Sequence, residues 1–380
     1  MSGLNRRWEL PKKRNKILAL FTDVYKSKGG VPVFNQNLLR ALSKVYHGRI
    51  IALSINDVLK ENNSRYYFEG CSRGKVKFVF KTLLTSIINK PDFIICGHVN
   101  ISPLCLLIKK GLGIPYITVT HGIDAWDVKS IKKRKGLTSS DIIVSVSNYT
   151  KVRIKEQLGL KEDKFFILPN AVDGVNFKPK PKPGYLIKRY GVEDRVVLLT
   201  VCRLDKSEAY KGYDKIIEAL PKIIKKIPNL VYLIGGKGND APRIKRLIKD
   251  RGLDDYVKLI GLIPEKELVD HYNLCDIFVM PSKGEGFGIV FLEAVACGKP
   301  VICGNKDGSV DAVLNGKLGI LVDPDNIDQI ADAIINVLQG NVPNHLLDPS
   351  YLRKTVLEHY GSDKFTKRVK GLLKRVKDEL

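Results

Sequence analysis

Two carboxylates and three glycines stand close together in the last third of the chain. They follow an apolar run and lead into a helix-like segment, in the order Gly284, Glu285, Gly286, Gly288 and Glu293. A glycine loop that leads into a helix N-terminus presents free backbone N–H groups and the positive end of the helix dipole, so it suits a phosphate. A carboxylate accepts two hydrogen bonds from a sugar diol. The stretch therefore predicts a ligand that carries both a phosphate and a sugar.

The same stretch also fits a plain strand–loop–helix unit. In that interpretation the glycines are turn residues and the glutamates are solvated. The helix is predicted to end at Cys297, with Gly298 as its left-handed cap and Pro300 just beyond. Spacing alone leaves both interpretations open.

Two permanent cations occupy another predicted strand-to-helix loop. Arg203 follows a strand, and Lys211 precedes Gly212 at the start of the next helix. Such a pair suits a diphosphate, because Arg grips it with two parallel hydrogen bonds and Lys adds a mobile charge. The gap between the two cations contains Lys206, which competes with Lys211 for this role.

Three further loops follow predicted strands. Gly29 and Gly30 precede a helix, where they let a ligand approach the backbone or simply make a tight turn. His121 precedes Gly122, and a single histidine is more often structural than catalytic. The loop that ends at Gly238 is rich in glycine but lacks the G-x-G-x-x-G spacing, so it does not predict a nicotinamide dinucleotide.

The elements that position these loops alternate between strands and helices. Twelve apolar runs are predicted as strands, six in each half: 17–21, 50–55, 93–96, 116–120, 142–146 and 165–168, then 196–201, 230–234, 257–260, 277–280, 301–303 and 319–322. Unbroken apolar strands between helices indicate parallel sheets covered on both faces. We expect two Rossmann-like domains that face each other across a cleft, with ligands at the carboxyl ends of the strands.

A stiff linker separates the predicted domains. Three prolines and three lysines alternate between Phe177 and Gly184. We predict an N-terminal, acceptor-binding domain at 1–178 and a C-terminal, donor-binding domain at 179–361. The last segment, 362–380, has a helical and basic pattern.

Composition limits the classes of protein. No apolar stretch reaches the roughly 20 residues that a membrane span needs, and Ile17 to Phe21 is too short for the apolar core of a signal peptide. The seven cysteines are scattered without C-x-x-C pairs, which favours a reducing cytoplasm over disulfides or a zinc site.

The net charge of +24 is unevenly distributed. Residues 1–178 hold 31 Lys and Arg against 13 Asp and Glu, whereas residues 179–380 hold 33 against 27. Clusters at 6–16, 73–81 and 129–135 fit attachment to an anionic membrane surface. A merely solvated surface is the alternative, and no recognisable nucleic-acid module is present.

Glu285 and Glu293, in the frame G-E-G-F-G…E-A-x-A-x-G-x-P-V-I, resemble the E-x7-E motif of the retaining glycosyltransferases of family 4. The resemblance covers nearly the whole chain. It implies the GT-B fold, in which the last helix crosses back to the N-terminal domain. It also implies a nucleotide-diphosphate sugar, UDP- or GDP-linked, as the donor, with no metal and no other cofactor required.

The same resemblance assigns roles to individual residues. It implies catalytic roles for His121, which reaches the transferred sugar, and for Arg203, Lys211 and Glu285. Donor contacts are expected from Gly29, Gly30, Arg203, Lys211, Gly238, Ile263, Glu285, Gly286, Phe287, Gly288 and Glu293. The longer gap before Lys211 departs from the family pattern, and the role of Asp124 stays open.

The function expected is a retaining hexosyltransferase that acts on a lipid-linked or otherwise anionic acceptor at the cytoplasmic face of the membrane. Negative charge that develops on the leaving diphosphate would be stabilised by the cations and the loop amides. Glu285 as a covalent nucleophile is an alternative mechanism. The alternative functions are a membrane- or polyanion-binding protein with a decayed transferase site, and a phosphorylase or epimerase on the same fold.

Overall fold

The structure is a computed structural model that describes residues 15–27 and 29–380. It divides into two compact units. The first consists of residues up to 119, 128–144 and 369–380, and the second of residues 120–127 and 145–368. Most of the basic cluster predicted at 6–16 lies outside the described residues.

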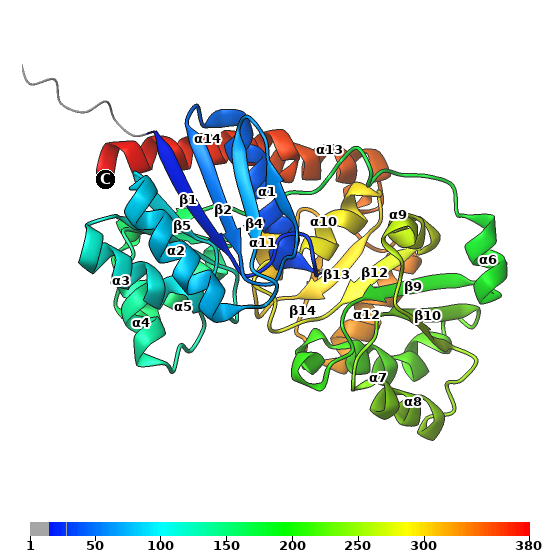
Figure 1. The fold of residues 1–380 in the computed structure, drawn as a ribbon. Coiled ribbons are helices and arrows are strands. Elements are labelled where there is room, and N and C mark those ends of the chain that lie inside the picture. Colours follow the sequence, from blue (N-terminus) through cyan, green and yellow to red (C-terminus); the bar gives the residue numbers. More distant parts are fainter. Residues whose placement is uncertain (1–14, 28) are drawn as a thin grey trace, which may run out of the picture. The chain divides into compact units, whose positions relative to one another are not determined.

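The first sheet contains eight strands in the order β3-β4-β2-β1-β5-β6-β7-β8. Their bounds are β1 Lys16–Phe21, β2 Arg49–Ser54, β3 Lys60–Asn62, β4 Tyr66–Gly70, β5 Phe93–Cys96, β6 Tyr116–Thr120, β7 Ile142–Ser145 and β8 Phe165–Ile167. The neighbours from β4 to β6 pair in parallel, as the alternation of apolar strands and helices predicts. Figure 1 shows β1, β2 and β4 of this sheet in blue.

The prediction of six strands in the first half is wrong by two. The structure adds β3 and β4, which pair with each other in an antiparallel hairpin at the edge of the sheet. The hairpin escaped prediction because β3 reads Lys-Glu-Asn and because the apolar run of β4 is short, with only Phe68 and Gly70 buried. An edge strand needs one buried face at most, so it carries a weaker sequence signal.

The second sheet contains six parallel strands in the order β11-β10-β9-β12-β13-β14. Their bounds are β9 Val196–Val201, β10 Leu230–Gly235, β11 Val257–Gly261, β12 Ile277–Met280, β13 Val301–Gly304 and β14 Ile320–Val322. All six lie within one residue of the prediction. Because the strands are parallel, the loops that follow them all lie at the carboxyl ends of the strands, on one side of the sheet.

Fourteen α-helices are found in the described part of the chain. They are α1 Gly30–Val45, α2 Lys75–Asn89, α3 Ser102–Leu112, α4 Ile131–Thr138, α5 Asn148–Leu158, α6 Gly184–Tyr190, α7 Tyr213–Ile224, α8 Ala241–Asp250, α9 Glu265–Leu274, α10 Ile289–Ala296, α11 Ser309–Ala312, α12 Ile327–Leu338, α13 Pro349–Tyr360 and α14 Ser362–Glu379. Four short 3₁₀ helices lie between them, at Val99–Ile101, Glu162–Lys164, Lys206–Lys211 and Asn344–Leu346.

Helix α7 shows how the sequence covers the second sheet. Its buried side chains include Ile216, Ile217, Leu220 and Ile223, which recur at helical spacing on one face. They join the apolar cluster formed by the strands, of which Val279 of β12 is a member. Fully burying one such side chain stabilises the fold by about 1.5–3 kcal/mol.

The last helix links the two units, as the fold prediction requires. Helix α14 begins in the second unit, and its residues from 369 onward belong to the first. None of the described helices combines the length and the apolar character that crossing a bilayer demands.

Candidate functional site

The two predicted cations follow β9 in the second unit. Lys211 ends the 3₁₀ helix Lys206–Lys211, and only 14% of its side chain is exposed. Its Nζ lies 2.9 Å from Oε1 of Glu285 in the glycine loop. Arg203 is largely exposed at the start of the same segment. Lys206 is exposed at the other end of the 3₁₀ helix, so the structure places Lys211 rather than Lys206 beside Glu285.

Glu208 joins the two cations, and sequence reasoning missed it. Its carboxylate pairs with Arg203 and lies 3.4 Å from Nζ of Lys211. The carboxylate is almost completely buried, which makes its attraction to both cations stronger than it would be in water. The longer gap between Arg203 and Lys211 supplies this residue. An acidic residue within a gap bounded by two cations is a signal that could have identified it.

The electrostatics keep Lys211 charged. Burial alone would lower the pKa of its ammonium group, but the nearby Glu285 carboxylate outweighs this, and the pKa lies above its ordinary value. A permanent positive charge therefore sits against the glycine loop at any physiological pH.

The glycine loop allows no side chain at its centre. A Cβ on Gly286 would lie 1.7 Å from the carbonyl oxygen of His121, and a Cβ on Gly122 would lie 2.4 Å from Cα of Gly286. Gly288 has φ +87° and precedes α10, with no side chain capping that helix. The first N–H groups of α10 thus have no capping side chain and are oriented as an anion requires.

Buried polar groups fix the loop in place. Ser147 Oγ donates to the carbonyl of Gly286 over 2.6 Å. Asp307, after β13, accepts from Ser282 Oγ at 2.7 Å and from the backbone N–H of Glu285 at 2.8 Å. Burial raises the pKa of Asp307 to about 6, although these hydrogen bonds act in the opposite direction. The loop is therefore preorganised by partners that sequence reasoning did not identify. Asp307 could have been suspected because it follows a strand end.

Glu293 occupies a much drier place than Glu285. It is the one charged residue of α10, whose other side chains are apolar. The hydroxyl of Tyr272, on α9, donates to its Oε2 over 2.7 Å. Burial raises the pKa of Glu293 to about 7, while the Tyr272 hydrogen bond works against that rise. The proton of Glu293 is thus exchangeable near neutral pH.

His121 lies beside the glycine loop through its backbone. Its N–H donates to Oδ1 of Asp124 at 2.9 Å, which shapes the turn after β6. Burial raises the pKa of the Asp124 carboxyl, and the attraction of His121 opposes that rise. The stretch 120–127 belongs to the second unit, so His121 and Glu285 are parts of one compact body.

The loops that carry the expected donor contacts Gly238 and Ile263 lie near the loop of the two cations. A Cβ on Gly238 would meet the carbonyl oxygen of Leu204 at 2.0 Å. Ile263 is almost completely buried, with its Cδ1 packed against Gly235. These contacts gather the loops after β9, β10 and β11, and the ligand roles of Gly238 and Ile263 stay predictions.

Two other predicted residues lie in the first unit. Gly29 has φ +135° and precedes α1, which starts at Gly30. Their contact with the donor stays a prediction. The expectation that no metal is required also stays a prediction. Within the residues that the structure describes, no group of three or more His, Cys, Asp or Glu side chains is arranged to hold a metal ion.

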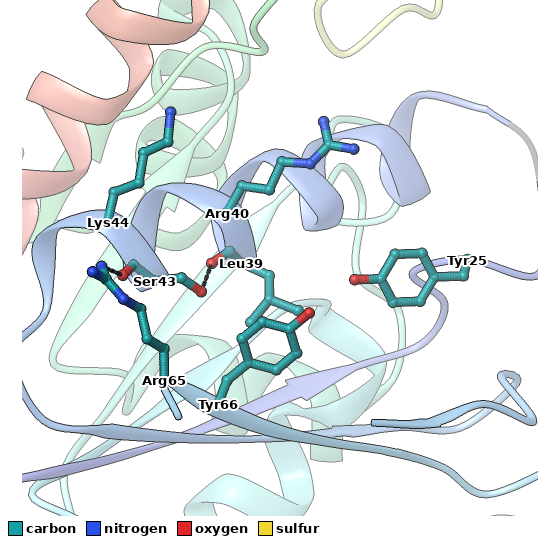
Figure 2. Close-up of a pocket in the computed structure, with 7 residues that line it drawn as sticks. All are labelled: Tyr25, Leu39, Arg40, Ser43, Lys44, Arg65 and Tyr66. Carbon is teal, nitrogen blue, oxygen red and sulfur yellow. Dashed lines mark hydrogen bonds between the residues drawn. The ribbon is translucent and has the colours of Figure 1, made fainter. Parts of the chain in front are cut away.

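A separate basic pocket of about 440 Å³ lies in the first unit (Figure 2). It is lined by Tyr25, Leu39, Arg40, Ser43, Lys44, Arg65 and Tyr66. A guanidinium N–H of Arg65 donates to the Ser43 carbonyl over 2.6 Å. None of the predicted donor-site residues lines this pocket, so it adds positive charge to the first unit without belonging to the site described above.

Comparison with known proteins identifies relatives of both units. The family model described as "Glycosyl transferases group 1" matches residues 187–350, and "Glycosyltransferase Family 4" matches residues 28–174. A GDP-mannose-dependent alpha-(1-6)-phosphatidylinositol monomannoside mannosyltransferase of Mycolicibacterium smegmatis is 33% identical over 252 residues, which cover 62% of this chain and 65% of the relative.

Two further matches extend the comparison. A phosphatidylinositol N-acetylglucosaminyltransferase subunit of Arabidopsis thaliana is 28% identical, over 62% of this chain and 52% of the relative. The alignments thus span somewhat less than two thirds of these curated relatives. The crystal structure of Anabaena HepE in complex with UDP superposes with a TM-score of 0.76 at 19% identity, covering 95% of this chain and 100% of HepE.

The two family models together account for most of the sequence, and the fold superposes on that of HepE over nearly the whole chain. The chain belongs to glycosyltransferase family 4 and has the GT-B fold.

Proposed function

We propose that this protein is a retaining hexosyltransferase. It would transfer a hexose from a nucleotide-diphosphate sugar to a hydroxyl of a lipid-linked, anionic acceptor. The observation that carries the proposal is the mostly buried Lys211–Glu285 ion pair beside the glycine loop. It holds a fixed cation against a carboxylate that lies four residues before the N-terminus of α10, where free N–H groups begin.

The cations and the glycine loop would stabilise the leaving diphosphate. Cleavage of the sugar–phosphate bond places negative charge on the diphosphate, and preorganised donors lower the energy of that charge most. Arg203, Lys211 and the amides from Gly286 to Gly288 are these donors. Glu208 pairs with both cations, so a diphosphate would compete with its carboxylate for them.

The two carboxylates would bind the sugar hydroxyls of the donor. Glu285 would accept hydrogen bonds from hydroxyls of the transferred hexose, and Glu293 would accept them from the ribose diol. His121, whose backbone touches the glycine loop, would contact the transferred sugar. The departing phosphate would take the proton of the acceptor hydroxyl on the same face of the sugar, so no side-chain nucleophile is needed.

The relatives support a lipid acceptor but differ in their donors. The Mycolicibacterium relative is named as GDP-mannose-dependent and acts on a phosphatidylinositol mannoside, whereas HepE was crystallised with UDP. The Arabidopsis relative also carries phosphatidylinositol in its name. An anionic glycolipid at the cytoplasmic membrane face agrees with the basic first half of this chain.

A thermal-shift screen against GDP, UDP and ADP tests the donor site, because a ligand that binds only the folded state raises the melting temperature. We expect one of these nucleotides to raise it by several degrees, and the Lys211→Ala variant to abolish the shift. Lys206→Ala is the matched control and should keep it. If none of the three nucleotides shifts the melting temperature of the unmodified protein, the proposal fails.

A transfer assay with the matching nucleotide sugars tests the reaction itself. Arg203→Ala and Glu293→Ala should each lower the rate of hexose transfer by about 100-fold. Losses of only two- or threefold in both variants would contradict the assigned roles.

A further inference from the structure

Helix α2 of the first unit packs with an unusual face toward the core. Its buried residues are Phe78, Thr82 and Ser86, which recur every four positions and so share one face. Thr82 and Ser86 are completely buried, although both are hydroxyl residues. A helix that only covers a core shows the reverse pattern, with its apolar face inward and its polar face in water.

Six of the eight bulky apolar side chains of α2 face outward instead. The exposed ones are Val76, Val79, Phe80, Leu84, Ile87 and Ile88. Val76 is 84% exposed, Phe80 65% and Ile88 67%. The spacing from 76 through 80, 84 and 88 is that of one helical stripe, opposite the stripe of buried residues. The sequence therefore maintains an apolar stripe that the described structure leaves uncovered.

Cations accompany the apolar stripe. Lys75, Lys77 and Lys81 lie on α2 and Arg73 just before it, and the helix has no Asp or Glu. Lys81 pairs with Glu69, whereas Lys75 and Lys77 are exposed. A helix that combines large apolar side chains with basic residues and no acidic ones is suited to an anionic lipid surface.

The neighbouring helices continue both features. In Figure 1, α2, α3 and α4 lie on one side of the first unit, and α2 packs against α3 and α3 against α4. Leu107 and Leu112 of α3 and Ile131 of α4 are exposed. The basic stretch at 129–135 overlaps α4.

We propose that the exposed face of α2 inserts into the headgroup region of a membrane that contains anionic lipid. Val76, Phe80, Leu84, Ile87 and Ile88 enter the interface, while Lys75 and Lys77 contact lipid phosphates. The proposal deepens the proposed function, since it identifies the surface by which the enzyme reaches a lipid acceptor, but it depends on the α2 face alone and not on the donor site.

The size and charge of the face favour a bilayer over a second copy of the chain. A helix of 15 residues is about 22 Å long and about 10 Å wide, so its footprint is far below the roughly 800 Å² per partner of a stable interface. A symmetric pairing of α2 with its own copy would also bring basic residues together without an acidic partner. An anionic membrane removes both difficulties.

Vesicle co-sedimentation of the full-length protein tests the proposal. The probe is phosphatidylcholine vesicles with about one third phosphatidylglycerol, at about 0.1 M and about 0.5 M salt. The variant Phe80→Ser/Ile88→Ser should bind at least about tenfold more weakly at both salt concentrations. The control Val152→Ser/Val175→Ser removes two exposed valines of the second unit and should bind like the unmodified protein.

A second measurement uses fluorescence and does not depend on a variant that loses vesicle binding. In the variant Phe80→Trp, the new indole should shift its emission to shorter wavelength with anionic vesicles, relative to the unmodified protein with its own two tryptophans. Equal vesicle binding by Phe80→Ser/Ile88→Ser and an unshifted Phe80→Trp emission would overturn the proposal. So would a dimer in solution that this serine variant converts to a monomer.

The donor-induced rise in melting temperature separates this proposal from the proposed function. A serine variant that keeps the nucleotide shift and loses vesicle binding is folded and supports the α2 surface. If the protein binds vesicles through α2 but no nucleotide shifts its melting temperature, the transferase proposal fails and the proposed membrane surface is still supported.

Discussion

The glycine loop of the second unit and helix α2 of the first unit both hold positive charge, but they hold it in opposite ways. Around the loop, Lys211 is mostly buried and paired with Glu208 and Glu285. On α2, Lys75 and Lys77 stand in water beside exposed apolar side chains. Buried and paired charges fix one small ligand in one geometry, whereas solvated charges attract a broad surface at low cost and are weakened by salt. The same residue type therefore provides geometric precision in one region and long-range attraction in the other.

The strongest test of this difference is to remove the cation of Lys211. Lys211→Ala should lower kcat/KM for the donor by about 100-fold or more, because it removes a fixed charge and leaves Glu285 unpaired. Steady-state kinetics of hexose transfer provide the measurement. The exposed Lys206→Ala should change kcat/KM by less than about twofold. Comparable losses in both variants would mean that burial does not distinguish the two lysines.

The next test concerns the tight fit of the loop. Gly286→Ala would place a methyl group 1.7 Å from the His121 carbonyl oxygen, so the loop must shift and the melting temperature should fall by several degrees. The nucleotide-induced shift should disappear as well. Gly111→Ala on α3 meets nothing within 4 Å and is the matched control, with stability equal to or above that of the unmodified protein. A Gly286→Ala protein of normal stability would show that the contact with His121 is loose.

Replacing the solvated lysines of α2 should have a smaller effect, and the loss of vesicle binding should depend on salt. Lys75→Gln/Lys77→Gln should weaken binding to anionic vesicles by about thirtyfold at low salt, since each nearby cation contributes about 1 kcal/mol. At about 0.5 M salt the difference should nearly vanish. Co-sedimentation at two salt concentrations measures both. A loss that persists at high salt would mean that these lysines act by a local contact.

The smallest expected effect concerns the pH dependence of stability. The native pKa of Glu293 is raised to about 7 from an ordinary value near 4.5, so the native state holds a proton that the unfolded state has released between these pH values. The contribution of Glu293 to stability therefore falls as pH rises from about 4.5 to about 7. Glu293→Gln keeps the Tyr272 partner but cannot ionise, so it should melt a few degrees above the unmodified protein at pH 8 and about equally at pH 4.5. Parallel melting curves across that range would contradict the buried, protonated state.

Much of the fold followed from local patterns. The second sheet was predicted strand by strand, because its central strands are unbroken apolar runs between helices. The cap at Gly298 is confirmed by its φ of +73°. The hairpin β3–β4 was missed because both of its strands are at most partly buried. Helix α2 would be oriented wrongly by its periodicity alone, since nothing local indicates that Thr82 and Ser86 rather than Phe80 and Ile88 face the core.

The candidate site also contains some features that the sequence shows and others that only the structure shows. The spacing of Glu285 and Glu293 is local, so the sequence shows it directly. The contact of Gly122 with Gly286 joins residues 164 positions apart, and it depends on how the turn after β6 meets the loop after β12. The pairing of Glu208 with Arg203 depends on the 3₁₀ turn between the cations. Such partners become visible only once the backbone is placed.

The membership of residues 120–127 in the second unit has a mechanical consequence. The interlocked backbones of Gly122 and Gly286 anchor that short excursion of the chain to the body that carries Glu285. The position of His121 relative to Glu285 is therefore set within one compact unit and does not depend on where the other unit lies.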